Sequence, residues 1–212
     1  LLKNGIDLST DLFEVNAAPH TFLGGIRIDE WGRTTVNGLY AGGEAAGGIH
    51  GANRLGGLAL IDSYVFGFRS GMAAALEAKK REKPDPESGG WRETIRDLSD
   101  RSNRRGAGPT ASDWRQEIQD HVVESLGQVR SEERLSEGLA GLNTIGERFE
   151  DVDVSGKSKR TRFENLCNMF ESNNLITVAR MLGTAARHRK ETRGGHFRID
   201  YPDRDDEHFL GN

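Results

Sequence analysis

The sequence predicts an α+β fold in two parts, in which short strands and a buried helix are followed by a bundle of three helices. Glycines crowd into residues 24–57, where short apolar runs end in glycine, and an almost entirely apolar stretch of helical length follows at residues 58–76. Beyond a polar stretch at residues 83–112, apolar residues recur every three or four positions, as on amphipathic helices. We therefore expect domains at residues 1–82 and 113–212, joined by a linker.

The first part is expected to contain two short strands and one helix. Residues 25–29 alternate apolar and polar side chains, which is typical of a strand, and residues 30–33 follow as a tight turn. The apolar run at residues 38–43 ends in glycines and predicts a buried strand. Residues 58–76 are apolar nearly all round, which predicts a buried helix.

The second part is expected to form a small antiparallel bundle of three helices. The serine and aspartate at residues 112–113 are candidate caps for a first helix that begins at Trp114. A second helix is expected at residues 132–149 and a third at about residues 162–190, before a charged and irregular tail at residues 191–212. The apolar stripe of the first helix has a spacing of four and comprises Trp114, Ile118, Val122 and Leu126, with Val129 continuing it.

The composition excludes several classes of protein. The 212 residues carry a formal net charge of −4, which gives no electrostatic reason to expect nucleic-acid binding. No stretch approaches the roughly 20 apolar residues that span a bilayer. The single cysteine, Cys167, rules out a multi-cysteine metal site and falls on an apolar stripe, where core packing is expected. No metal site is predicted, because His121, His188 and His208 have no partners at metal-ligand spacing.

The 27 glycines exceed the usual share of about 7% and concentrate ahead of the apolar helix. A strand leads into a glycine turn with the lone carboxylate Glu44, and a glycine loop leads into a helix that starts near Leu58. Glycines let backbone approach a flat ligand, a carboxylate accepts hydrogen bonds from hydroxyl groups, and helix N-terminal N–H groups attract anions. The layout by itself predicts an anion- or nucleotide-binding loop, with an ordinary turn as an equal alternative.

Three blocks of the sequence follow one another over nearly the whole chain. The first is PHTFLGGI at residues 19–26, and the second comprises GLYAGGE at residues 38–44 and HGANRLG at residues 50–56. The third is RKETRGGHFRIDYPDRDD at residues 189–206. Together they resemble the succinate dehydrogenase/fumarate reductase flavoprotein family, which includes L-aspartate oxidase. The first block is similar to the His-x-x-Met-Gly-Gly block of that family, and the third to its Glu-Ser-Arg-Gly-Ala-His block. The resemblance implies the C-terminal portion of such a flavoprotein, with part of a split, Rossmann-like FAD-binding domain ahead of a helical domain.

The resemblance implies a set of site residues. Glu44 would bond the FAD ribitol, and Ala59 and Leu60 would lie at the helix start near the pyrimidine edge of the flavin. His20 and Arg54 would bind the dicarboxylate substrate, and the planar guanidinium suits a carboxylate because it donates two parallel hydrogen bonds. Without the resemblance, a surface salt bridge and a hydrogen-bonded core histidine are the simpler interpretations of Arg54 and His20.

Other residues of the blocks have weaker assignments. His50 precedes the Gly-Ala-Asn-Arg run, and a direct role for it is the less favoured interpretation. For Arg193 and His196, packing against the rest of the flavoprotein is expected as much as chemistry. Leu23 stands where the family has methionine, and Leu58 begins a Leu-Ala-Leu-Ile run in place of the usual Asn-Ser-Leu-Leu, which suggests that only backbone contacts the flavin there.

The resemblance also implies an activity and partners. The expected reaction interconverts succinate and fumarate by hydride transfer at flavin N5, with an iron–sulfur protein subunit exchanging electrons. The chain opens without an initiator methionine and carries no G-x-G-x-x-G loop, so we expect a fragment that is inactive alone and completed by the N-terminal remainder of the flavoprotein. A cytoplasmic location is implied, with membrane association through partner subunits. The alternatives are L-aspartate oxidase and a helical docking module for an iron–sulfur subunit.

Overall fold

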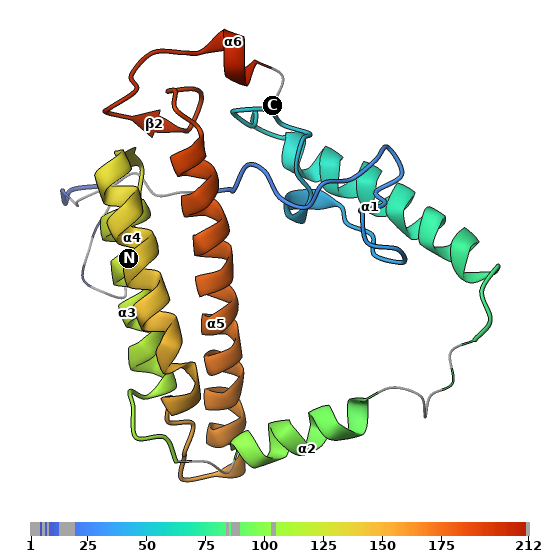
Figure 1. Ribbon diagram of the computed structural model, residues 1–212, viewed down its shortest axis with the longest axis vertical. Coiled ribbons are helices and arrows are strands. Elements are labelled where there is room, and N and C mark those ends of the chain that lie inside the picture. The colour runs from blue at the N-terminus through green and yellow to red at the C-terminus, as the bar shows by residue number, and fades with distance from the viewer. Residues whose placement is uncertain are drawn as a thin grey trace. The chain divides into compact units, whose positions relative to one another are not determined.

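The computed structural model forms two compact units, Leu1–Lys80 and Arg81–Asn212, called unit 1 and unit 2 below (Figure 1). The structure describes residues 5, 7, 9–12, 20–83, 85, 90–102 and 105–210. Three parts of the predicted blocks and linker lie outside the described residues, namely Pro19, residues 84 and 86–89, and residues 103–104. Among the helices of the described ranges, none combines the length and the apolar character needed to cross a membrane.

Unit 1 consists of one long helix and a glycine-rich series of turns that packs against it. Helix α1 covers Leu58–Ala78, as the apolar run predicts, and the short 3₁₀ helix η2 covers Gly43–Ala45. The strands predicted at residues 25–29 and 38–43 do not form as regular strands. Each is reduced to an isolated bridge, one joining Ile26 to Ala46 and the other joining Tyr40 to Arg33.

Glycines in a left-handed conformation explain why the second predicted strand is so short. Gly38 and Gly43 have φ angles of 84° and 68°, which end an extended run on both sides. The tight turn predicted at residues 30–33 is confirmed, because the Gly32 amide donates a hydrogen bond of 3.0 Å to the carbonyl of Asp29. The sequence therefore places the turns correctly but overstates the extended segments between them.

Helix α1 buries small and polar side chains within unit 1, namely Asp62, Ser70 and Ala73. Its exposed large apolar side chains include Leu58, Leu60, Ile61, Tyr64, Val65, Phe68, Met72 and Leu76. The burial predicted for this helix is therefore not found within unit 1. The reason is that the turns meet α1 through backbone: a Cβ atom on Gly42 would lie 2.9 Å from the Phe66 carbonyl carbon.

The predicted three-helix bundle forms in unit 2. Helices α3 (Ala111–Leu126), α4 (Glu132–Glu147) and α5 (Lys159–His188) run side by side and pack on one another, as Figure 1 shows. A short 3₁₀ helix, η3 (Arg148–Asp151), follows α4 in place of the last turn predicted for the second helix. The bundle agrees with the sequence prediction because helical periodicity is a local signal.

Hydroxyl side chains cap the three bundle helices. The side chain of Thr110 accepts a hydrogen bond from the amide of Asp113, so α3 begins three residues before the predicted start at Trp114. Ser131 and Ser158 cap α4 and α5 in the same way. The prediction that residues 112–113 cap the first helix is therefore wrong, because the threonine two positions earlier already satisfies the free amide.

The stretch predicted as a linker contains a helix that the sequence pattern did not predict. Helix α2 covers Trp91–Ser102 and has no buried residue. Arg101 near its end donates hydrogen bonds to Asp97 at 2.8 Å and to Glu150 of η3 at 2.9 Å, which ties the helix to the bundle end. Trp91 and Ile95 lie four positions apart, as on one face of a helix, but the charged residues around them leave too few apolar positions for a helical pattern to be recognised.

The core of unit 2 agrees with the predicted stripe of the first helix better than with the apolar stripe expected for the third, which comprises Phe163, Leu166, Met169, Phe170, Leu175, Val178, Met181 and Leu182. Leu166 and Met169 are buried as expected, but Phe163, Leu175, Val178 and Met181 are exposed. The buried face of α5 continues from Leu166 and Met169 through Ser172, Ile176, Ala179, Gly183 and Ala186. Small residues face the bundle because they let helices approach closely. A stripe defined by large apolar side chains does not include them.

Gly138 of α4 marks a close approach between α3 and α4. A Cβ atom there would lie 2.6 Å from the Ser125 hydroxyl and 2.9 Å from a Leu126 methyl carbon. We expect Gly138→Ala to destabilise the bundle by about 1–3 kcal/mol through overpacking, despite the better helix propensity of alanine. Urea unfolding monitored by circular dichroism measures this effect. Glu137→Ala, at the exposed neighbouring position, is the control and should change stability by less than about 0.5 kcal/mol.

The tail after α5 is ordered rather than irregular. Strand β2 (Phe197–Arg198) pairs in parallel with strand β1 (Val129–Arg130), which lies between α3 and α4. The short helix α6 (Asp206–Phe209) follows. Val129 therefore pairs with the tail instead of continuing the stripe of the first helix, because α3 ends at Leu126.

Two buried charged residues hold the tail in place. Glu191, with no exposed surface, accepts hydrogen bonds from Arg189 at 2.8 Å, from Arg193 at 2.9 Å and from the Asp205 amide at 2.9 Å. Arg198, equally buried, pairs with both carboxylate oxygens of Asp200 at 2.7 and 2.8 Å. Charged groups without exposed surface are tolerated only with partners of this kind.

Arg198 also satisfies the end of the longest helix. Its Nη1 donates to the carbonyls of Ala186 and Arg187 at 2.9 and 3.2 Å, which are in the last turn of α5. Carbonyls in the last turn have no partner within the helix and carry the negative end of its dipole, so a guanidinium is well suited to them. The tail therefore serves as the C-terminal cap of α5.

Candidate functional site

Three of the predicted site residues of unit 1, Glu44, Arg54 and His20, interact through their charges, and Glu44 lies in η2. Its Oε1 accepts a hydrogen bond of 2.8 Å from the Phe22 amide. That bond, a further one from the Thr21 side chain and the positive charges of Arg54 and His20 hold the pKa of Glu44 below its usual value, against a smaller effect of burial. Glu44 is therefore an ionised acceptor at neutral pH, and the structure brings the predicted Glu44, Arg54 and His20 into one electrostatic neighbourhood.

Arg54 carries a donor that the described part of the chain leaves unused. Its Nε is buried and has no hydrogen-bond partner among the described residues. Within the described part of the chain, its Nη1 makes only a long contact of 3.4 Å to the Leu55 carbonyl. A buried donor without a partner costs about 1–3 kcal/mol, so its presence indicates a ligand that accepts from it. A carboxylate is the matching acceptor, because it can bond two guanidinium donors in parallel.

The start of helix α1 supplies backbone donors at the predicted positions of Ala59 and Leu60. The residue before the helix is Gly57, with a φ of 84°, and no side chain caps the helix. Because the first amides of a helix have no partner within it, those of Ala59 and Leu60 are directed out of the helix end. A Cβ atom at Gly48, Gly51, Gly56 or Gly57 would meet nothing within 4 Å. The residues present thus fit an anionic, flat group such as a flavin: free amides, open glycine backbone and an ionised carboxylate.

A buried aspartate lies outside the set of predicted site residues. Asp62 Oδ2 lies 3.4 Å from His50 Nε2, and the two side chains are 4% and 15% exposed. The other carboxylate oxygen, Oδ1, is buried without a hydrogen-bond partner among the described residues. The sequence signal that could have found it is that Asp62 is the sole charged residue between Leu58 and Phe68. An isolated charge in an apolar helix is rarely there for stability.

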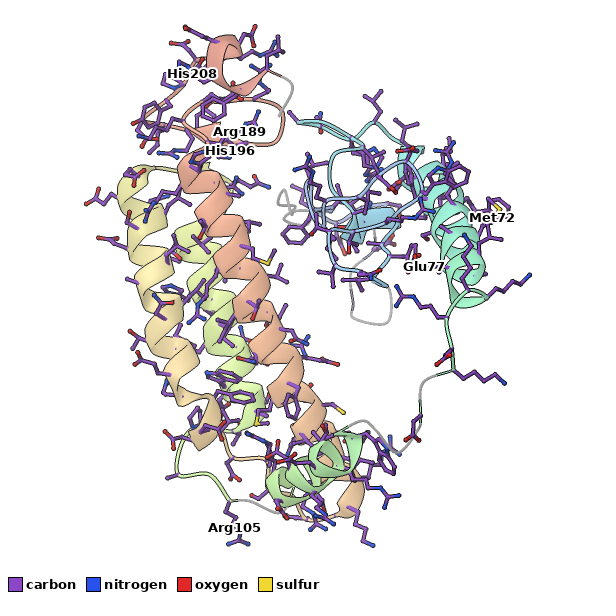
Figure 2. The ribbon with its side chains drawn as sticks, turned by 45° about the vertical axis from the view of Figure 1, so that its right-hand side comes forward. Met72, Glu77, Arg105, Arg189, His196 and His208 are labelled. Carbon is purple, nitrogen blue, oxygen red and sulfur yellow. The ribbon has the colours of Figure 1, made fainter. Side chains whose placement is uncertain are left out.

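The residues singled out in the tail block lie in unit 2. Arg189 and His196 lie together at the end of α5, as Figure 2 shows, and His196 Nε2 is 3.1 Å from the Arg189 carbonyl. His196 Nδ1 is 2.8 Å from Arg130 Nη1, and since a guanidinium only donates, Nδ1 accepts. Burial, together with the charges of Arg130 and Arg198, lowers the pKa of His196. Arg193 donates a hydrogen bond to Glu191, so His196 and Arg193 both have partners within unit 2.

Family models match both parts of the chain. The model described as "FAD binding domain" matches residues 11–60, and the one described as "Fumarate reductase flavoprotein C-term" matches residues 115–212. The first includes Glu44 and Arg54, and the second includes the bundle and the ordered tail. The first match contains the first two sequence blocks, and the second match contains the third block.

Individual proteins agree with these matches. One subunit of the fumarate reductase (CoM/CoB) of Methanothermobacter marburgensis is 35% identical over 208 residues, which cover 95% of this chain and 36% of that protein. The L-aspartate oxidase of Yersinia pestis is 32% identical over 206 residues, covering 96% and 36%. The apo Sdh1 complex of Mycobacterium smegmatis matches in structure with a TM-score of 0.85 and 30% identity, over 95% of this chain and 34% of that one.

The chain spans about a third of the length of these relatives. Its fold is that of the matching part of the solved flavoprotein, and the match includes the FAD-binding part. The FAD implied by the sequence blocks is thus the cofactor of the family. The glycine-rich turns, the helix start and the bundle with its tail together identify the chain as a member of the fumarate reductase/succinate dehydrogenase flavoprotein family.

Proposed function

We propose that the full-length protein containing this chain interconverts succinate and fumarate. The observation that carries the proposal is the buried Arg54 Nε without a partner among the described residues, beside the ionised Glu44 and His20. These groups suit a small dianion, because Arg54 offers a fork of donors and His20 offers a second donor. Relatives named as fumarate reductases and succinate dehydrogenases support the same substrate pair.

Each site residue has a proposed role. Arg54 binds one substrate carboxylate and stabilises the negative charge that develops during the reaction. His20 donates to the second carboxylate. Glu44 accepts a hydrogen bond from a ribitol hydroxyl, and the amides of Ala59 and Leu60 bond the pyrimidine edge of the flavin. When bound, FAD supplies the two-electron chemistry by accepting or donating a hydride.

The proposed partners complete the protein. We propose that an iron–sulfur subunit exchanges electrons with the flavoprotein, that any attachment to a membrane is through partner subunits, and that the N-terminal remainder of the flavoprotein supplies the rest of the FAD site. The 212-residue chain by itself is then inactive and binds FAD weakly. A flavin titration of this chain that gives a sub-micromolar Kd would contradict this part of the proposal.

The decisive experiment is a substrate comparison with the full-length, FAD-loaded protein. Turnover of succinate or fumarate with an artificial electron carrier, and none of L-aspartate, is the expected result. The relative named L-aspartate oxidase makes that enzyme the second candidate, and oxidation of L-aspartate with no turnover of succinate would select it. The absence of all three activities would leave a docking module for an iron–sulfur subunit.

A further inference from the structure

Asp62 occupies a position where a carboxylate is costly. It lies in the second turn of α1, and its side chain is only 4% exposed. Burying a carboxylate costs several kcal/mol unless partners compensate for its lost hydration. The helix gains no cap from it, since no side chain caps α1. One carboxylate oxygen, Oδ1, has no hydrogen-bond partner among the described residues, so the group is poorly explained by stability alone.

The partner of Asp62 lies on the loop that precedes the helix. His50 Nε2 is 3.4 Å from Asp62 Oδ2, and the imidazole is 15% exposed. The contact joins two residues twelve positions apart and closes the intervening chain against α1. An imidazole N–H that faces a carboxylate is held in one orientation, as histidines with carboxylate partners are elsewhere.

The segment closed by this contact carries Arg54 at its centre. Residues 51–57 form the loop, and at its far end the Leu58 amide donates to the Leu55 carbonyl at 3.3 Å. Among the described residues, a Cβ atom on Gly51, Gly56 or Gly57 would meet nothing within 4 Å, so the loop has open space beside these glycines. The His50–Asp62 contact lies at the near end of the loop and joins it to α1.

We infer that Asp62, acting through His50, is a positioning residue that holds the loop of residues 51–57 and thereby sets the place of Arg54. This inference rests on the proposed function in one respect, since it takes Arg54 to bind the substrate carboxylate. Neither side chain needs to touch the substrate. Misplacement of a binding group by about 1 Å costs up to ~100-fold in rate, so a loosened loop should weaken the site without emptying it of FAD.

The test uses variants of the full-length, FAD-loaded protein. Asp62→Leu and His50→Ala remove the contact, whereas His50→Gln keeps an N–H donor near the Nε2 position. Ser63→Ala is the matched control on the same helix, because among the described residues its hydroxyl bonds only the Ala59 carbonyl, at 2.9 Å. The readouts are hydrogen exchange of the 51–57 amides and the Kd of succinate, measured from the perturbation of the flavin spectrum.

We expect Asp62→Leu and His50→Ala to speed exchange in the loop and to raise the succinate Kd by about 10-fold. His50→Gln and Ser63→Ala should remain within about 2-fold of the wild type. Unchanged loop exchange in Asp62→Leu, or equal effects of His50→Gln and His50→Ala, would overturn the inference. Loop exchange is measured without substrate. Faster exchange in the variants of a protein that binds no succinate would therefore support the role of the His50–Asp62 contact in holding the loop, and would contradict the proposed function instead.

A double-mutant cycle separates positioning of Arg54 from a general structural effect. If Asp62 acts through Arg54, adding Asp62→Leu to Arg54→Ala should change the succinate Kd by less than about 2-fold. The same tenfold effect in both backgrounds would show that Asp62 acts elsewhere and would overturn the inference. Loss of FAD from both Asp62→Leu and His50→Ala would do the same, since the pair would then hold the cofactor site as a whole.

Discussion

Replacing Arg54 with alanine is expected to lower kcat/KM for succinate by about 100- to 1,000-fold in the full-length protein. The substitution removes a buried Nε that has no partner among the described residues, and the guanidinium fork around it. A preorganised donor at a site of developing negative charge contributes about this much to catalysis. Steady-state kinetics with an artificial electron acceptor measures the effect, and the flavin absorbance should remain that of the wild type.

Two further variants make this prediction specific. Arg54→Lys keeps the positive charge but loses the planar fork, so we expect it to remain at least ~10-fold below the wild type. Arg27→Ala removes an exposed cation of the same unit and should leave kcat/KM unchanged. Retention of more than a third of the wild-type kcat/KM by Arg54→Ala would remove the basis of the proposed substrate site.

Replacing Glu191 with alanine is expected to destabilise the tail by about 3 kcal/mol, because it leaves Arg189 and Arg193 without their shared carboxylate. These guanidiniums are 24% and 15% exposed, so water compensates for part of the loss. Hydrogen exchange of the Thr192 amide, which bonds the Asp203 carbonyl, reports opening of the tail directly.

Asp206→Ala is the matched control for this prediction, because Asp206 is also a carboxylate partner of Arg193. Its side chain is 64% exposed, so its loss should change the opening free energy by less than about 1 kcal/mol. Similar effects of the two substitutions would show that burial of Glu191 does not make its ion pairs stronger than those at the surface.

The tail should also respond to acid. Hydrogen bonds from Arg193, the Asp205 amide and Arg189 lower the pKa of Glu191 from 4.5 to about 2, against the opposing effect of burial. A carboxyl group whose pKa is lower in the folded than in the unfolded chain stabilises the fold at a pH above its unfolded pKa. This stabilisation is lost as the pH falls towards the folded pKa. Exchange protection of the tail should therefore decline between about pH 4.5 and 2 in the wild type, and be much less dependent on pH in Glu191→Ala.

The helices of the bundle were predictable because their signals are local. Trp114, Ile118 and Leu126 repeat with the helical period and are all buried in α3. The third helix was predicted within a few residues of its bounds, but its buried face only in part: Leu166 and Met169 are buried, whereas Ala179 and Gly183 pack there in place of larger side chains. Periodicity locates a helix, whereas the choice of face depends on how closely a neighbour approaches.

The residues of the candidate site were predicted from motif order, and their roles stay predictions. Glu44, Arg54 and His20 were identified from residue blocks, and the structure places them in one electrostatic neighbourhood. The anchor between His50 and Asp62 was not predictable, because an aspartate within an apolar run has no spacing signal that connects it to a histidine twelve residues earlier. Such pairs depend on how a loop folds back on its helix.

The sequence alone determined the two-part organisation, the bundle helices and the family blocks, all of which depend on local periodicity or on residue order. Tertiary structure alone decided that α1 exposes its apolar face within unit 1, and that Glu191 and Arg198 order the tail. It also decided that Asp62 meets His50. The physical reason is common to all three. Burial and charge pairing depend on segments that are distant in sequence, and the sequence around a charged residue does not show which residue will compensate for its burial.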